Sequence, residues 1–165
     1  MSDFTQDFAY RNINRDDIAE IKATKWLDDN KKSYRIIGFN SKGGKIPSRQ
    51  WFRLCPFLRK MPDILVFGFT GNYLLEVKGC KVNVHLKLVD LVEYAKWDAL
   101  QTLYIFIYST TKDSIYIMSL KALLKQASVT GFSTGKFNDN NLQYISIPVK
   151  NLTRYKKSNN EIVIF

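Results

Sequence analysis

Apolar residues in the first part of the chain change from the spacing of a helix to the spacing of strands. From Asp16 to Asp29, apolar side chains at Ile18, Ile21 and Trp26 follow acidic residues in the first turn, which predicts an amphipathic helix. Ser33 to Phe39 is β-prone and is followed by a Ser-Lys-Gly-Gly turn signal, so we expect a strand there.

Two short apolar runs, Ile64 to Phe69 and Tyr73 to Val77, are separated by Thr70-Gly71-Asn72. A Gly/Asn turn between β-prone runs is typical of a β-hairpin. We expect a longer helix from His85 to Leu100, because its apolar residues fall on one broad stripe. The stripe consists of Leu88, Val89, Val92, Ala95 and Ala99.

The last third of the chain alternates again. Thr102 to Tyr108 and Ser114 to Met118 read as strands, a short helix follows from Ser119, and strand-like pieces occur at Tyr144 to Pro148 and Ile162 to Phe165. Through Tyr108 the order is helix, strand, two-stranded hairpin, helix, strand. This order predicts an α/β layer architecture with a mixed sheet.

Length and composition restrict the class of protein. The 165 residues suit one domain, 1–165, and 45 % hydrophobic with 24 % charged residues is typical of a globular chain. The longest unbroken apolar run, Leu103 to Tyr108, is far shorter than the roughly 18 residues that a membrane span needs. The start, MSDFTQDFAY, lacks the features of a signal peptide, and two cysteines are too few for a disulfide framework. We therefore expect a cytoplasmic protein without a membrane partner.

The chain is strongly basic, with 25 Lys and Arg against 15 Asp and Glu and a formal net charge of +10. Such a charge favours polyanionic partners such as nucleic acid. A Lys- and Asn-rich chain is also typical of an AT-rich genome, so charge alone leaves both interpretations open.

The predicted hairpin carries the residues with the clearest chemistry. Asp63 precedes its first strand, and Glu76 and Lys78 share one face near the end of the second. With a turn centred near Gly71, Asp63 would lie roughly opposite Lys78 and within reach of Glu76. Two carboxylates beside backbone carbonyls suit Mg²⁺ or Mn²⁺, and Lys78 would orient water or stabilise developing charge. The alternative is a charged pair that only faces solvent at a strand edge.

Pro62-Asp63, followed after residues 64–75 by Glu76-Val77-Lys78, resembles the motif of the PD-(D/E)XK nuclease superfamily. The resemblance covers about residues 14–110 and is strongest to phage-type or Holliday-junction-resolvase-like members. It implies a restriction-endonuclease-like α-β-β-β-α-β core with a C-terminal extension of about residues 111–165.

The same resemblance assigns roles to the motif residues. Asp63, Glu76 and the main-chain carbonyl of Val77 would hold the metal, and Lys78 would be the catalytic lysine. Some family members carry a Gln-x-x-x-Tyr pattern on the following helix, where this chain has Asp90-x-x-x-Tyr94 on the face opposite the apolar stripe. A solvated helix face is an equal interpretation of these two residues.

Further residues are candidates for substrate or metal contacts. Several members of the superfamily use an acid from the first helix, which here would be Glu20. Basic residues flank the hairpin in sequence and are interleaved with Trp51 and Phe52, a composition that suits phosphate contacts and base stacking. The candidates for nucleic-acid binding are Lys45, Arg49, Arg53, Lys81 and Lys87.

Other chemistries have less support. The chain has a single histidine, His85, which we interpret as a helix-start residue rather than a catalytic base. No phosphate-loop motif occurs. The sequence therefore predicts a homodimeric, Mg²⁺-dependent DNA endonuclease that hydrolyses phosphodiester bonds by metal-activated water, with branched or recombination intermediates as candidate substrates and Mn²⁺ as a substitute metal. The alternatives are an RNA endonuclease and a non-catalytic module that binds nucleic acid or protein.

Overall fold

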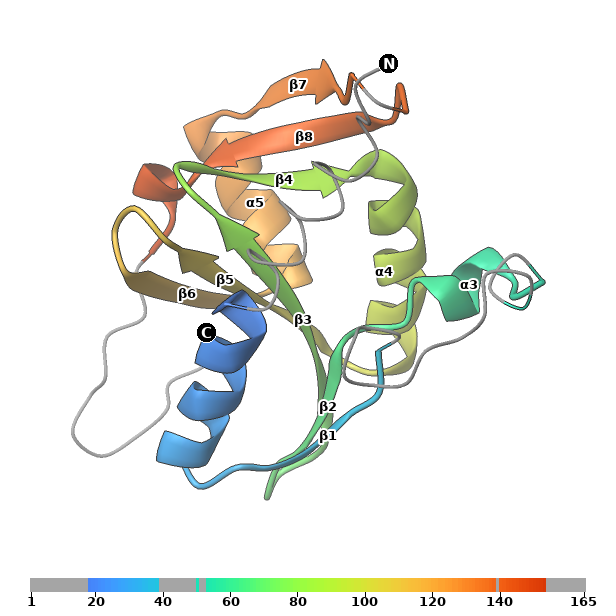
Figure 1. Cartoon of the computed structure of the whole chain (residues 1–165), viewed down its shortest axis with the longest axis vertical. Coiled ribbons are helices and arrows are strands. Elements are labelled where there is room, and N and C mark those ends of the chain that lie inside the picture. Colours follow the sequence, from blue (N-terminus) through green and yellow to red (C-terminus); the bar gives the residue numbers. More distant parts are fainter. Residues whose placement is uncertain (1–17, 39–49, 51–52, 139, 154–165) are drawn as a thin grey trace, which may run out of the picture.

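The computed structural model describes residues 18–38, 50, 53–138 and 140–153, whose strands form two sheets. The strands of the larger sheet, sheet A, are β1 (Ser33–Ile36), β2 (Ile64–Phe67), β3 (Tyr73–Cys80), β5 (Leu103–Ser109) and β6 (Ser114–Ser119). Their spatial order is β1-β2-β3-β5-β6 (Figure 1). The strands of the smaller sheet, sheet B, are β4 (Asn83–Lys87), β7 (Ser133–Lys136) and β8 (Gln143–Pro148), in the order β4-β8-β7.

Sheet A is mixed, because β1, β2 and β3 form an antiparallel meander whereas β3 and β5 pair in parallel. A parallel pair needs a crossover, and β4 together with helix α4 (Leu88–Leu100) supplies it. The paired strands β3 and β5 are buried almost throughout. Their mostly apolar sequences are typical of central parallel strands that are covered on both faces. The predicted α/β class, with a mixed central sheet flanked by helices, is confirmed.

Helical residues 18–29 cover one face of sheet A, as Figure 1 shows in blue. The predicted helix is confirmed over these residues, and Asp16 and Asp17 lie outside the described part of the chain. The predicted apolar face is only partly right, because Ile18 and Ile21 are exposed. Small residues instead allow a close approach to the sheet. The helix buries Ala19, Ala23, Trp26 and Leu27 against Ile64, Val66, Leu75 and Phe106.

The opposite face of sheet A is covered by α4, α5 (Leu120–Thr130) and sheet B. Apolar side chains from these elements form one cluster with the sheet: Leu74, Leu103, Ile105 and Ile107 from sheet A, Leu86, Ile145 and Ile147 from sheet B, and Leu120 and Leu123 from α5. The Ser119 side chain caps α5 by accepting a hydrogen bond from the Ala122 amide, which explains why this helix begins where the sequence predicts.

The predicted helix from His85 to Leu100 is wrong at its start and in its orientation. Residues 85–87 belong to β4, so the helix begins at Leu88. The predicted apolar stripe faces solvent, with Val89 47 % and Val92 57 % exposed. The buried residues of α4 are Asp90, Glu93 and Tyr94. Polar contacts to neighbouring elements, rather than apolar periodicity, therefore decide which face of this helix is turned inward.

A short helix, α3 (Pro56–Arg59), interrupts the connection that the sequence places between Lys42 and Lys60. The ring of Phe57 stacks on that of Trp97 in α4, with centroids 4.1 Å apart and planes inclined by 10°. The Trp97 indole also donates to the Phe57 carbonyl at 3.2 Å. These contacts fix α3 beside α4, on the side where Figure 1 shows it.

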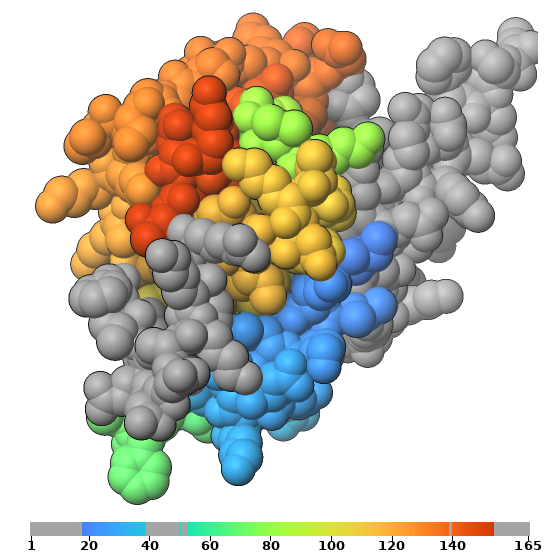
Figure 2. All heavy atoms as spheres, turned by 90° about the vertical axis from the view of Figure 1, so that its left-hand side faces the viewer, coloured from blue at the N-terminus to red at the C-terminus, as the bar shows by residue number. Residues whose placement is uncertain are grey.

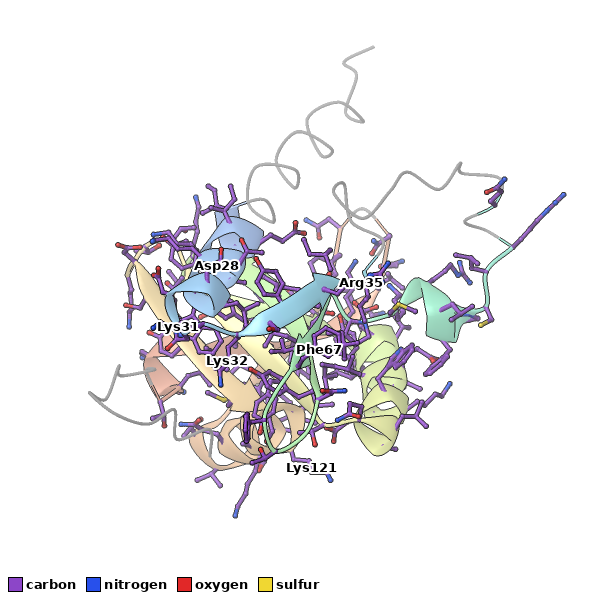
Figure 3. All side chains as sticks on the ribbon, turned by 90° about the horizontal axis from the view of Figure 1, so that it is seen from below. Asp28, Lys31, Lys32, Arg35, Phe67 and Lys121 are labelled. Carbon is purple, nitrogen blue, oxygen red and sulfur yellow. The ribbon has the colours of Figure 1, made fainter. Side chains whose placement is uncertain are left out.

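Strand β1 is an edge of sheet A. Figure 3, seen from below, labels Arg35 on β1 and Phe67 at the end of β2. Phe67 pairs with Ser33 and therefore lies close to the turn that holds Lys31 and Lys32. Arg35 is exposed, and charged side chains on an edge strand discourage pairing with another chain. Of the helices that the structure describes, none is both long and apolar enough to cross a membrane.

Candidate active site

The hairpin register brings two carboxylates together at one end of β2 and β3. Ile64 pairs with Leu75, so Asp63, directly before β2, lies opposite Glu76. The expectation that Asp63 lies opposite Lys78 is therefore wrong by two residues. The observed register places the midpoint of the β2–β3 connection closer to Phe69 than to Gly71. Because the turn lies earlier in the sequence than expected, Asp63 lies opposite an earlier residue of β3.

Asp63 is held by backbone contacts on both sides. Its Oδ2 accepts a hydrogen bond from the Val77 amide at 2.7 Å. Its main-chain carbonyl accepts from the amides of Ile37 and Gly38 at 2.9 and 3.0 Å. A Cβ at Gly38 would lie only 2.7 Å from the Asp63 Cα, so glycine is needed for this close approach. The chain after β1 thus fixes the position of Asp63.

Glu76 is buried and shares one oxygen between two partners. Its Oε1 accepts from Lys78 Nζ at 2.5 Å and from the Tyr94 hydroxyl. The ammonium group of Lys78 also lies 5.6 Å from the centroid of the Tyr94 ring, a distance that suits a cation–π contact. Glu76, Lys78 and Tyr94 therefore form a connected cluster between β3 and α4.

Burial and charge perturb the titration of this cluster. Desolvation raises the pKa of Asp63 well above its ordinary value, and the negative charge of Glu76 raises it further, while Lys78 opposes both effects. Burial lowers the pKa of Lys78, but Glu76, Tyr94 and Asp63 outweigh it, so the pKa lies well above its usual range. Lys78 is thus a permanent cation at neutral pH. Burial and Glu76 likewise raise the pKa of Tyr94.

The two additional candidates, Glu20 and Asp90, differ in their relation to the cluster. Glu20 is buried at 9 % exposure, and its charge contributes to the raised pKa of Asp63. Asp90 forms an ion pair with Lys60, with Nζ and Oδ1 2.6 Å apart. Asp90 therefore links α4 to the end of α3, a contact that the sequence pattern did not reveal because the two residues belong to separate elements.

The predicted nucleic-acid residues are dispersed. Arg53 and Lys81 are exposed and Lys87 is half-buried in β4. Lys45 and Arg49 lie outside the described residues, as do Trp51 and Phe52. Cys80 is buried at the end of β3, and desolvation raises the pKa of its thiol to about 11, consistent with a structural role.

Two further observations delimit the site. Within the described part of the chain, no group of three or more His, Cys, Asp or Glu is arranged to hold a metal ion. An open pocket lies between helical residues 18–29 and the β5–β6 turn, which Figure 2 shows side by side in blue and yellow. Lys22, Trp26, Tyr108 and Asp113 line this pocket, and none of the candidate site residues does.

Comparison with known proteins gives a limited result. No family model matches the chain, and no curated protein matches its sequence. Among solved structures, the chain is similar to D212, a nuclease from a fusselovirus, with a TM-score of 0.48 and 14 % sequence identity. The similarity covers 93 % of this chain and 89 % of D212.

Proposed function

We propose that this protein is a metal-dependent nuclease that hydrolyses phosphodiester bonds. One observation carries the proposal: Asp63, directly before β2, lies opposite Glu76 of β3, with Lys78 bound to Glu76. Placing a half-buried carboxylate beside a buried one is costly, and the raised pKa of Asp63 expresses that cost. A fold has little structural reason to place such a pair here, whereas a cation-dependent site needs one.

The donor set suits Mg²⁺ or Mn²⁺. Carboxylate and carbonyl oxygens are the ligands that these hard cations prefer, and a divalent ion would relieve the repulsion among Asp63, Glu76 and Glu20. We propose that Asp63, Glu76 and the Val77 carbonyl hold the ion. A bound ion of this kind polarises a phosphoryl oxygen and lowers the pKa of bound water.

The other side chains of the cluster have distinct roles. The Lys78 ammonium is held charged beside Glu76, where it stabilises the negative charge that develops on the phosphoryl oxygens. Tyr94 positions Glu76 by donating to Oε1. Because Lys78 and Tyr94 share this one oxygen, Glu76 keeps a second oxygen for another partner.

This arrangement also supports membership of the PD-(D/E)XK superfamily. Pro62-Asp63 immediately precedes β2, and Glu76-Val77-Lys78 lies within β3, the positions that the resemblance implies. The meander of β1, β2 and β3, followed by α4 and the parallel strand β5, gives the implied core order, with β4 inserted before the helix.

DNA is the proposed substrate, with branched DNA as one form and RNA as the alternative. The net charge of +10 favours either nucleic acid. We also propose that two copies act together, because one site cuts one strand. A sedimentation mass of twice the monomer supports this, and a monomer mass at assay concentrations contradicts it.

The test is cleavage of a supercoiled plasmid, a four-way DNA junction and a matched RNA hairpin, each with Mg²⁺ and with chelator. We expect Mg²⁺-dependent cutting that Glu76→Gln and Lys78→Gln abolish. Glu93→Gln is the matched control, because Glu93 is also buried but pairs with Lys96 at 2.8 Å rather than with the cluster. Cutting that survives Glu76→Gln, or that Glu93→Gln abolishes equally, contradicts the proposed site. Binding without cutting of any substrate favours the non-catalytic module.

A further inference from the structure

Sheet B has one face turned to the core and one turned outward. Val84 and Leu86 of β4 and Ile145 and Ile147 of β8 are buried against the main cluster. Residues alternate between the two faces of a strand, so His85 and Lys87 lie on the outer face. In Figure 1 this sheet lies at the top of the molecule, at the opposite end from the turn between β2 and β3.

Three aromatic rings gather on this outer face. His85 and Tyr144 stack, with centroids 4.4 Å apart and planes inclined by 11°. Phe137, directly after β7, lies 4.5 Å from Tyr144 and 6.0 Å from His85. His85 is exposed, and Tyr144 and Phe137 are half-buried, so the rings are accessible in a way that core aromatics are not. We name these three residues the aromatic platform.

Gly135 is what lets Tyr144 lie across the neighbouring strand. The two residues are paired in the β7–β8 register, and a Cβ at position 135 would lie 2.5 Å from the Tyr144 hydroxyl. Any other residue would force the ring to shift. The position of the Tyr144 ring is therefore built into the strand pairing.

The platform is also electropositive. The Lys87 ammonium lies 5.4 Å from the centroid of the Phe137 ring, and Lys87 pairs with Tyr144 across β4 and β8. Lys87 is the lysine on this face, because Gly135 pairs with Tyr144 and Lys136 therefore lies on the other face of β7. The three strands contain no Asp or Glu. Accessible rings beside a cation suit a ligand that has both planar faces and negative charges. A neutral sugar or an apolar peptide would use the rings but not the lysine.

We propose that the aromatic platform binds single-stranded nucleic acid, with bases stacked on Tyr144, Phe137 and His85 and a phosphate at Lys87. Base–aromatic stacking needs unpaired bases, because the faces of paired bases in a duplex are already occupied. Desolvation lowers the pKa of His85, so its ring is neutral at pH 7. A neutral ring can stack on a base without first losing the water that surrounds a charge. This binding is separate from the proposed cleavage, which uses β2, β3 and α4.

The test is fluorescence anisotropy with a labelled oligonucleotide of about 15 nucleotides, a length that spans one binding module of this kind. DNA and RNA versions and the corresponding DNA duplex are titrated in chelator, so that no cleavage occurs. We expect Tyr144→Leu to weaken single-strand binding about five- to hundredfold, as the loss of a stacking partner does, and to leave duplex binding unchanged. Tyr144→Phe, which keeps the ring, should bind like the wild type.

Two variants guard against indirect effects. Lys87→Gln leaves the rings in place and removes one phosphate contact. The slope of log affinity for single-stranded DNA or RNA against log salt concentration should therefore decrease in magnitude by about 1. Phe69→Leu is the matched control, since Phe69 is a fully exposed aromatic in the β2–β3 connection, away from sheet B. Unchanged affinity in both Tyr144→Leu and Lys87→Gln, or an equal loss in Phe69→Leu or on duplex, overturns the proposal.

The same titration with Glu76→Gln separates this inference from the proposed nuclease. Single-strand binding that persists in Glu76→Gln, and that Tyr144→Leu then removes, supports the platform whether or not the wild type cleaves. Binding lost in Glu76→Gln and retained in Tyr144→Leu overturns the platform and assigns the contact to the candidate active site. Preference between the DNA and RNA oligonucleotides identifies which strand the platform takes.

Discussion

The hydroxyl of Tyr94 donates a hydrogen bond to Oε1 of Glu76, and this bond joins helix α4 to strand β3. Both residues are buried, so the bond forms where water cannot replace it. Lys78 donates to the same oxygen, which makes the carboxylate the common acceptor of the cluster. The polar face of α4 is thus turned inward for a specific reason: it supplies a partner that a buried carboxylate requires.

Replacing Tyr94 by phenylalanine tests the strength of this link. Tyr94→Phe keeps the ring but removes the donor to an ionised acceptor, and we expect the free energy of unfolding to fall by about 1.5–3 kcal/mol. Urea denaturation measures the change. Tyr73→Phe is the matched control, because the buried Tyr73 hydroxyl has no hydrogen-bond partner among the described residues. Its removal should be neutral or stabilising, and an equal loss in both variants would contradict the role of the Tyr94 bond.

The orientation of α4 is a feature that the sequence did not predict correctly. The apolar stripe through Val89 and Val92 predicted the helix correctly from Leu88 onward but predicted the wrong buried face. Periodicity reports the polarity of side chains and not the contacts that each face of the helix makes. Asp90 and Tyr94 were recognised as a pair on one face. Their inward position depends on Lys60 and Glu76, which come from distant parts of the chain.

The hairpin was predicted more completely, since its signals are local. The turn residues and the two β-prone runs fixed the existence of β2 and β3, and the spacing of Glu76 and Lys78 fixed their shared face. The register was wrong by two residues, because the sequence does not determine which residues of the β2–β3 connection close the turn. Strand β4 was missed, since its pairing partner β8 lies far along the chain.

Asp63 should make the stability of the metal-free protein depend on pH. Its pKa is raised in the folded state, so the folded chain binds the proton more tightly than the unfolded chain does. The contribution of Asp63 to the free energy of unfolding therefore falls as the pH rises from about 4 through the pKa of the folded state. Asp63→Asn removes this contribution and should be more stable than the wild type at neutral pH in chelator, with the difference vanishing below about pH 4. Thermal unfolding across this pH range measures the difference.

Asp98→Asn is the control for that experiment. The Asp98 carboxylate also accepts a hydrogen bond from a backbone amide, that of Leu103 at 2.8 Å, but has Lys121 rather than a second carboxylate as its charged neighbour. Its replacement should lower stability at neutral pH, opposite in sign to Asp63→Asn. Added Mg²⁺ should raise the melting temperature of the wild type and leave Asp63→Asn unchanged. A destabilised Asp63→Asn protein in chelator contradicts the repulsion on which the metal site rests.

Gly38→Ala tests whether the end of β1 positions Asp63. The added Cβ would meet the Asp63 Cα at 2.7 Å. Because the Cβ is held rigidly by its own backbone and the Cα is a backbone atom, the two chain segments must separate. We expect a loss of about 1–3 kcal/mol in the free energy of unfolding, the usual range for overpacking. Cleavage should fall by more than the unfolded fraction explains, because the Asp63 carboxylate moves with its backbone. Unchanged stability and cleavage together would show that the approach is not constrained.

The exposed stripe of α4 can be checked with one substitution made at two sites. Val92→Lys places a charge at a position that is 57 % exposed, and we expect the free energy of unfolding to stay within about 0.5 kcal/mol of the wild type. Val84→Lys makes the same change on the inner face of sheet B, where the side chain is 1 % exposed, and should cost about 4 kcal/mol or more because the charge is buried without a partner. If instead Val92→Lys were as damaging as Val84→Lys, the apolar stripe would face a core, and Tyr94 would then be turned away from Glu76. The result therefore decides the helix orientation on which the candidate active site depends.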